Sequence, residues 1–253
     1  MQELASIVLG LGGRVYVLDI GRSFERQCKF LGGQFIEFSI GSQVCINPFS
    51  SIDDHNIENS SDSLSLLKPI ISLMVAPKAG TTDYEDSIIE RSLVDVWTKF
   101  GRKSTIDDLA KILQSDKDQV AQRLGEMLFP YTKRGAYGKF FNGESNINID
   151  DNFIVAELEN LKGKSDLQAV VFQIFILIIT NKILLGDRKT PSAIEFDEAW
   201  QALSGKQASQ LFSRILYTTK AEERNYVIKL QGEGYSIGDA IVRAAEDIYG
   251  KDD

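Results

Sequence analysis

The sequence has little of the chemistry that metal sites and disulfides require. Its one histidine, His55, lies in a stretch rich in serine, aspartate and asparagine, and its two cysteines, Cys28 and Cys45, do not have the spacing of metal ligands. These observations argue against a zinc site and against a disulfide framework. Cysteine usage of this kind is typical of a protein in the reducing cytoplasm.

A surplus of basic residues is also absent. The chain has 28 lysines and arginines against 36 aspartates and glutamates, a formal net charge of -8. A surface that holds phosphate backbones mainly through counterion release would need the opposite sign. Any contact with nucleic acid must therefore be local.

No uninterrupted apolar run approaches the length of a membrane crossing. The most apolar segment, Ala169 to Ile179, is interrupted by Gln173 and is about half of the roughly 20 residues that a crossing needs. It predicts a buried core helix. The first residues, Met1-Gln2-Glu3, do not resemble a signal peptide. We expect any membrane attachment to go through partner proteins.

What the chain does have is ordinary globular composition. With 253 residues, 43% hydrophobic and 25% charged, it suits one large domain or a core with an appendage. Its first forty residues alternate between helix and strand periodicity, with glycines at the junctions: helix 2–11, strand 14–20, helix 23–31 and strand 34–39. This order predicts an α/β fold with right-handed crossovers and a parallel sheet covered on both faces.

The middle of the chain has a different character. From residue 64 to 141 the pattern predicts helices at 64–75, 84–100, 105–113 and 118–128, with Thr105 and Asp108 as a capping pair. Strand patterns return at 146–149, 153–158, 192–196 and 226–230, with helices at 166–185, 208–223 and 237–249. We therefore expect an α/β core at 1–60 and 146–253, divided by an all-helical insertion at 61–145.

Asp197 and Glu198 are the most informative pair of residues. They end an apolar strand, and carboxylates in that position lie at the edge of a parallel sheet where open α/β folds bind ligands. In nucleotide hydrolases one carboxylate holds Mg²⁺ through water and the next orients or deprotonates the attacking water. A helix cap explains an acidic pair in this position equally well, so further motifs are needed to choose.

Four separated motifs favour the nucleotide-hydrolase interpretation of this pair. They are GGRVYVLDIGRSFERQCKFLGG at 12–33, INPF at 46–49, FIVAELENLKGKSDLQAVV from 153 and FDEAW at 196–200. In order and spacing they strongly resemble the TraC family of conjugative-transfer ATPases of type IV secretion systems, part of the wider group that includes FtsK and HerA. The resemblance covers the chain well to about residue 205 and covers the remainder more loosely.

The resemblance implies a RecA-like P-loop NTPase core with a helical insertion. It further implies a hexamer that uses ATP and Mg²⁺ at the cytoplasmic face of the secretion channel, where inner-membrane components of the system are its partners. Asp197 would be the Walker B aspartate, holding Mg²⁺ through water, and Glu198 the catalytic glutamate. Gln231, after the strand YVIKL, stands where such proteins commonly carry a glutamine that senses the γ-phosphate.

One motif of the family is missing. No G-x-x-x-x-G-[KT]-[ST] phosphate-binding loop occurs anywhere, although in the family it immediately precedes the residues that match Met1-Gln2-Glu3. Without that cradle most of the affinity for a triphosphate is lost. We expect the chain to be a partial reading frame, or else a natural protein that has lost nucleotide binding, and to hydrolyse ATP poorly or not at all.

Other polar residues have two interpretations each. Asp19 ends a strand and would contact the nucleotide, the neighbouring carboxylates or a partner subunit, or else cap the next helix. Arg22 would contact phosphate, a neighbouring subunit or only solvent. Asn47 most simply shapes a turn. Glu195 and Lys229 occupy equal offsets in strands expected to be neighbours, which predicts a cross-strand ion pair. The arginine finger of the hexamer remains undecided between Arg214 and Arg224.

The segment 129–141, FPYTKRGAYGKFF, interleaves aromatic with basic residues. This composition suits packing in the core or a surface for single-stranded DNA. Two functions besides the conjugative motor fit the sequence: a DNA-pumping ATPase of the FtsK or HerA kind, and a non-hydrolysing module that keeps the fold for assembly.

Overall fold

A computed structural model describes residues 2–52, 64–147, 149–185, 190–197 and 226–231. The side chains of residues 184, 185 and 226–231 are outside the description. The chain divides into two compact units. Unit 1 comprises Met1–Ser39, Asn148–Gly163 and Ile178–Asp253, and unit 2 comprises Ile40–Ile147 and Lys164–Leu177.

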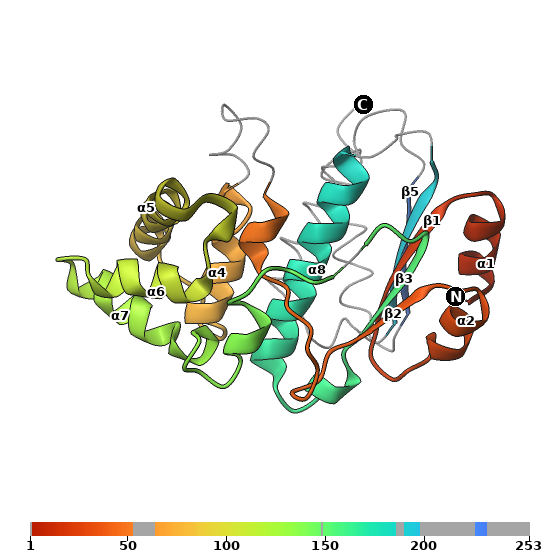
Figure 1. Ribbon diagram of the computed structural model, residues 1–253, viewed down its shortest axis with the longest axis horizontal. Coiled ribbons are helices and arrows are strands. Elements are labelled where there is room, and N and C mark those ends of the chain that lie inside the picture. The colour runs from red at the N-terminus through yellow and green to blue at the C-terminus, as the bar shows by residue number, and fades with distance from the viewer. Residues whose placement is uncertain (1, 53–63, 148, 186–189, 198–225, 232–253) are drawn as a thin grey trace, which may run out of the picture. The chain divides into compact units, whose positions relative to one another are not determined.

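Unit 1 is built on a five-stranded parallel sheet. Its strands are β1 (Arg14–Asp19), β2 (Gln34–Glu37), β3 (Phe153–Glu157), β4 (Ser192–Asp197) and β5 (Tyr226–Gln231), in the spatial order β2-β3-β1-β4-β5. Every neighbouring pair is parallel, so the carboxyl ends of all five strands meet at one edge (Figure 1). The predicted α/β fold with a parallel sheet is confirmed.

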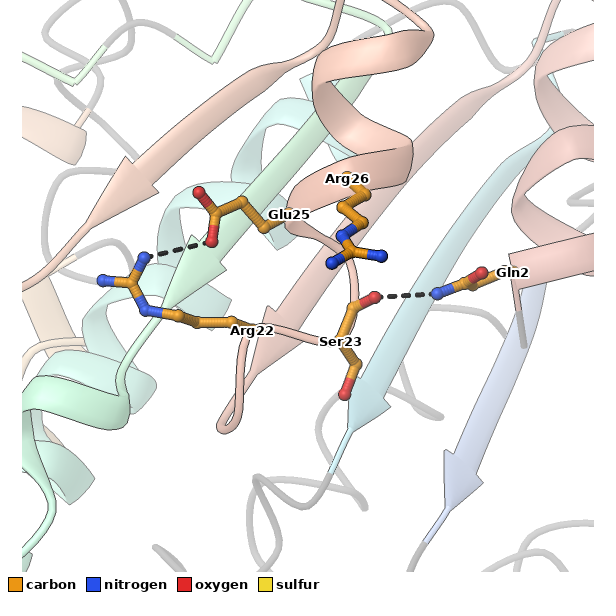
Figure 2. Close-up of a pocket in the computed structure, with 5 residues that line it drawn as sticks. All are labelled: Gln2, Arg22, Ser23, Glu25 and Arg26. Atoms are coloured by element: carbon orange, nitrogen blue, oxygen red, sulfur yellow. Dashed lines mark hydrogen bonds and ion pairs between the residues drawn. The ribbon is translucent and has the colours of Figure 1, made fainter.

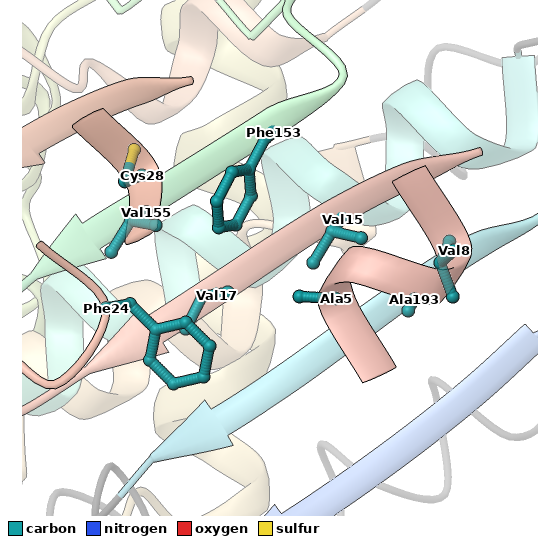
Figure 3. Packing of buried hydrophobic residues seen from close by; sticks show 9 residues of the cluster. All are labelled: Ala5, Val8, Val15, Val17, Phe24, Cys28, Phe153, Val155 and Ala193. Atoms are coloured by element: carbon teal, nitrogen blue, oxygen red, sulfur yellow. The ribbon is translucent and has the colours of Figure 1, made fainter. Parts of the chain in front are cut away.

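Two helices cover one face of this sheet, α1 (Gln2–Gly10) and α2 (Glu25–Phe30). Their apolar sides form one cluster with side chains from the middle three strands (Figure 3). The cluster consists of Ala5, Val8, Val15, Val17, Phe24, Cys28, Phe153, Val155 and Ala193, each at most 8% exposed. Burial of a large apolar side chain contributes about 1.5–3 kcal/mol, so this layer fixes where α1 and α2 lie over the strands.

A pair of glycines ends each of these helices. Gly12 and Gly32 adopt positive φ values of 75° and 71°, a conformation that terminates a helix at little cost only in glycine. The second glycine of each pair allows close backbone approach: a Cβ on Gly13 would lie 2.6 Å from the Pro191 carbonyl oxygen, and one on Gly33 2.7 Å from that of Phe153.

Gly33→Ala is therefore expected to destabilise unit 1 by about 1–3 kcal/mol, the usual cost of overpacking. The added methyl would meet backbone, which cannot move aside as a flexible side chain can. Chemical denaturation monitored by circular dichroism measures the change. Gly10→Ala is the matched control, because a methyl group added there would have nothing within 4 Å. Equal stability of the two variants would contradict the close approach.

Unit 2 contains the helices of the middle of the chain. They are α4 (Lys68–Val75), α5 (Asp83–Phe100), α6 (Ile106–Gln114) and α7 (Gln119–Met127). The predicted capping pair is confirmed, since the Thr105 hydroxyl accepts from the Asp108 N–H while the Asp108 carboxylate accepts from the Thr105 N–H. Thr82 and Glu85 form a second box at the start of α5.

Helix α8 (Ser165–Leu185) is the apolar helix predicted at 166–185. The stretch Ser165–Ile183 is long and apolar enough to cross a membrane by length and composition alone, which is longer than the interrupted run suggested. Of its most apolar 18-residue window, 67% is buried inside the protein. Such burial is typical of a core helix and agrees with the sequence interpretation.

One strand prediction is wrong. Asn146, Ile147 and Ile149 have no regular structure among the described residues. The Asn146 side chain instead accepts from the Cys45 N–H at 2.8 Å and donates to the Gln43 carbonyl oxygen at 2.7 Å. Side-chain bonds of this kind replace a strand ladder. The helices predicted at 208–223 and 237–249 lie outside the described residues.

Candidate nucleotide site at the carboxyl edge of the sheet

Polar residues end all five strands at the same edge. Asp197 of β4 pairs in register with Asp19 of β1 and with Gln231 of β5. On the other side of β1, Glu157 of β3 pairs in register with Glu37 of β2. Crevices at such edges are where ligands bind in open α/β sheets. The fold thus brings the backbones of three of the four predicted site residues, Asp19, Asp197 and Gln231, to one edge of the sheet.

Asp197 is partly exposed at the end of a strand whose preceding residues, 192–196, are buried. Its carboxylate can therefore reach a ligand in solvent. Glu198, the predicted catalytic residue, lies outside the described residues, as do Arg214 and Arg224. For Gln231 the backbone position is described and the side chain is not.

Asp19 is fully buried at this edge. Its Oδ2 accepts a 2.9 Å hydrogen bond from the Phe24 N–H, whereas Oδ1 has no hydrogen-bond partner among the described residues. Burial raises the pKa of Asp19 from 3.8 to about 7, and the negative charges of Glu157 and Asp197 add to the rise, while the Phe24 N–H opposes it. One oxygen of Asp19 thus holds the residue that precedes α2, and the contact of Asp19 with a nucleotide stays a prediction.

Glu157 is a site residue that the sequence analysis missed. It is fully buried, and its two oxygens accept from the Arg22 N–H at 2.8 Å and from the Glu159 N–H at 2.6 Å. Burial raises its pKa, and these backbone donors oppose the rise. The signal was available, since the strand FIVAE ends in a carboxylate just as IEFD does.

The backbone that Glu157 holds is strained. Arg22 has a φ of 59°, the one positive value of a non-glycine residue among those described. This region costs an L-residue about 1–2 kcal/mol. The Arg22 guanidinium donates to Glu25 at 3.0 Å and forms an ion pair with Glu37, so a loop with an unfavourable backbone is fixed from both sides.

Asn47 shapes a turn, as predicted. Its side-chain oxygen accepts from the Phe49 N–H, and its amide donates to the carbonyl oxygens of Ser104 and Gly143. It is 2% exposed and belongs to unit 2. Its role is structural.

The strand register places Glu195 beside Lys229, as the sequence predicted. Glu195 is fully buried in β4. The Lys229 side chain lies outside the description, so the ion pair stays a prediction.

The aromatic rings of 129–141 are mainly core residues. Tyr131, Phe140 and Phe141 are buried and pack against one another, with ring centroids 5.6 Å apart for Tyr131 and Phe141 and 6.0 Å for the two phenylalanines. Rings in such contacts are not free to stack on bases. Lys133, Arg134 and Lys139 of the same segment are exposed.

The described residues contain no group of three or more histidine, cysteine, aspartate or glutamate side chains arranged to hold a metal ion by themselves. Asp197 alone suits Mg²⁺, which usually keeps several waters and takes one or two carboxylates together with substrate phosphates. The donor set therefore fits an ion that arrives with a nucleotide.

Comparison with known proteins identifies the fold and family. A family model described as the TraG P-loop domain matches residues 1–245. The chain belongs to this family. Over 218 residues it is 28% identical to the protein TraC of Escherichia coli strain K12, an alignment that covers 81% of the chain and 24% of TraC. The chain thus spans about a quarter of the length of that relative.

Two solved structures have the same fold. VirB4 of Thermoanaerobacter pseudethanolicus superimposes with a TM-score of 0.79 at 20% identity, covering 98% of this chain and 70% of that one. The bacterial conjugative coupling protein TrwBdeltaN70, in its unbound form, gives 0.55 at 15% identity, covering 96% and 63%. The TraG P-loop domain of this chain is thus a RecA-like α/β domain, which confirms the predicted fold class.

Proposed function

We propose that the chain forms most of the ATPase motor domain of a conjugative type IV secretion system and acts by transferring the γ-phosphoryl group of ATP to water. The observation that carries this proposal is the alignment of Asp19, Asp197 and Gln231 at the carboxyl edge of the sheet in a TraG P-loop domain. The similarity to TraC and VirB4 supports the conjugative setting.

Each residue at the edge takes a separate role in this proposal. Asp197 holds Mg²⁺ through water, and the ion neutralises charge on the phosphates. Glu198, one residue further on, orients and deprotonates the attacking water. Gln231 senses the γ-phosphate from the neighbouring strand, and Asp19, whose Oδ1 has no hydrogen-bond partner among the described residues, contacts the nucleotide from β1. The phosphate-binding loop that would complete the site is not in this sequence.

The proposal extends to assembly. We place the protein in the cytoplasm as a hexamer, held peripherally at the inner membrane by secretion-system components without inserting into the bilayer itself. We also propose that residues 61–145 form a helical insertion between the core segments 1–60 and 146–253. A contact with single-stranded DNA would use the exposed basic residues of 129–141, because its buried rings are engaged elsewhere.

The decisive experiment compares two proteins. The 253-residue chain is expected to show almost no single-turnover release of phosphate from MgATP. The same chain with a G-x-x-x-x-G-K-T loop placed before Gln2 is expected to release it at least about 100-fold faster, because the loop amides and lysine supply most of the triphosphate affinity. A loop variant with lysine changed to alanine controls for the added length.

Two outcomes would contradict the proposal. A normal rate from the unextended chain would show that the loop is dispensable. No gain from the extended and folded chain would favour the non-hydrolysing assembly module. Stimulation of turnover by DNA would instead favour a DNA-pumping motor.

A further inference from the structure

A pocket of about 550 Å³ lies at the amino edge of the sheet, opposite the edge of the candidate nucleotide site. Its walls include the ends of α1 and α2, at Leu9-Gly10 and Leu31-Gly32-Gly33, and the residues that lead into β3, Asp151-Asn152-Phe153. All of them belong to unit 1. The pocket drawn in Figure 2 is a different one, because it lies beside the loop that follows β1, where Arg22 is bonded to Glu25. The amino-edge pocket has no part in the proposed nucleotide chemistry.

Large apolar side chains surround this amino-edge pocket and are exposed to solvent. Phe30 is 87% exposed, Leu11 72%, Ile7 59% and Leu31 42%. Leu31 lines the pocket, and each of the other three is the direct chain neighbour of a lining residue. Single exposed apolar residues are common, whereas several around one pocket are typical of a surface that binds another protein.

The charge at the pocket is negative. Asp151 is the one charged residue among the described residues that line it, and its side chain is exposed. Helix α1 ends in the wall of the pocket and has no basic residue in its last turn to offset the partial negative charge of a helix carboxyl end. Lys29, in the last turn of α2, is already bonded to Glu25 at 2.6 Å. The pocket therefore suits a segment that combines an apolar side chain with a basic one.

Residues 127–139 of unit 2 have this complementary chemistry. Met127 is 44% and Phe129 52% exposed, and Lys133 and Arg134 are exposed as well. The stretch 127–143 contains no acidic residue, in a chain whose formal net charge is -8. It offers two large apolar groups followed closely by two positive charges.

A second basic stretch of unit 2, residues 99–103, matches the pocket less well. Phe100 is its one large exposed apolar side chain, at 46%. Arg102 is already engaged, since its guanidinium donates to the Ser50 carbonyl oxygen at 2.9 Å. This stretch supplies a control with similar charge and exposure.

We propose that the amino-edge pocket of one copy of the chain receives the segment 127–139 of a second copy, with Phe129 as the apolar anchor and Arg134 paired with Asp151. An aromatic anchor seated in a pocket contributes most of the affinity of many interfaces, and complementary charges fix the partner. The contact joins two different surfaces, and heterologous contacts of this kind form rings when the rotation between copies closes. The inference rests on the assembly part of the proposed function and involves no residue of the nucleotide site.

Sedimentation velocity of the 253-residue chain at about 1–100 μM, a range that reveals interfaces of modest affinity, tests this contact. We expect the wild type to associate as its concentration rises, and Phe30→Ser and Phe129→Ser each to weaken association at least about tenfold, as loss of an anchor does. Both side chains are exposed, so the variants should fold, which circular dichroism checks. Phe100→Ser is the matched control and is expected to leave association unchanged.

An exchange of charges tests the pairing of Arg134 with Asp151. At low ionic strength, Asp151→Arg and Arg134→Asp are each expected to weaken association about tenfold, because each places like charges together. The double variant restores opposite charges and is expected to recover most of the loss. A double variant that associates no better than the single variants overturns the pairing.

The remaining outcomes separate this contact from the proposed function. A wild-type chain that stays monomeric overturns both the contact and the proposed hexamer. Association that Phe30→Ser leaves intact, or that Phe100→Ser weakens equally, overturns the contact alone. Fluorescence anisotropy with a labelled single-stranded oligonucleotide tests the rival occupant: DNA binding that Arg134→Asp abolishes, with association unchanged, assigns the segment to DNA and overturns the contact. Phosphate release by the chain with an added phosphate-binding loop tests ATP hydrolysis independently.

Discussion

In a chain that carries a phosphate-binding loop before α1, Glu198→Gln is expected to lower the rate of ATP hydrolysis by about 10²–10⁴-fold, the usual contribution of a general base. The amide keeps the size of the side chain and can still bond to water, but it cannot accept the proton. Affinity for ATP should change little, since in the proposed site other groups hold Mg²⁺ and the phosphates. Single-turnover phosphate release and separate nucleotide-binding measurements distinguish the two effects.

Asp197→Asn provides the comparison, because it alters the proposed metal ligand and leaves the proposed base. It is expected to raise the Mg²⁺ concentration needed for half-maximal rate, which Glu198→Gln should not do. Glu90→Gln, an exposed carboxylate of unit 2 paired with Lys68, controls for charge. If the Glu198 variant turned over at a rate within about threefold of its parent, well below the effect of losing a general base, Glu198 would not be that base.

Much of the core followed from local patterns in the sequence. The glycine pairs at 12–13 and 32–33 end helices and start strands, which is a local property of backbone conformation. The apolar runs of β1, β3 and β4 have the near-continuous hydrophobicity of strands buried in a parallel sheet. Asp19, Asp197 and Gln231 were each expected at the end of a strand, and they share one edge because parallel strands align their carboxyl ends.

Features that depend on contacts between residues far apart in the sequence could not be predicted from local patterns. Asn146 lies in a segment with a strand pattern, yet its amide bonds to Gln43 and Cys45, about a hundred residues earlier in the chain. The positive φ of Arg22 could not be foreseen either, since it is sustained by Glu157, 135 residues away. Local propensity contains no information on such tertiary contacts. The strained backbone at Arg22 therefore could not be predicted from the sequence and required the strand arrangement.

Asp19→Asn is expected to stabilise the chain at alkaline pH. The pKa of Asp19 is about 7 in the folded chain and 3.8 when unperturbed. Between these values the folded state binds a proton that the unfolded state has released, so the free energy of unfolding falls as pH rises. The loss is absent below the unfolded pKa and complete above the folded one. At about 1.36 kcal/mol per pKa unit, it amounts to at most about 4 kcal/mol.

Urea denaturation of both proteins between pH 4.5 and 8.5 measures this difference. Asparagine still offers an oxygen to the Phe24 N–H, so the start of α2 should remain held, and it carries no charge to be buried. The variant's advantage is expected to grow from pH 5 to about 7 and to level off by pH 8. Asp95→Asn, an exposed position on α5, should stay within about 0.5 kcal/mol of wild type throughout. If the free energies of unfolding of the wild type and of Asp19→Asn changed in parallel across this pH range, Asp19 would be ionised in the folded chain. Another group would then have to offset the repulsion among the carboxylates at this edge.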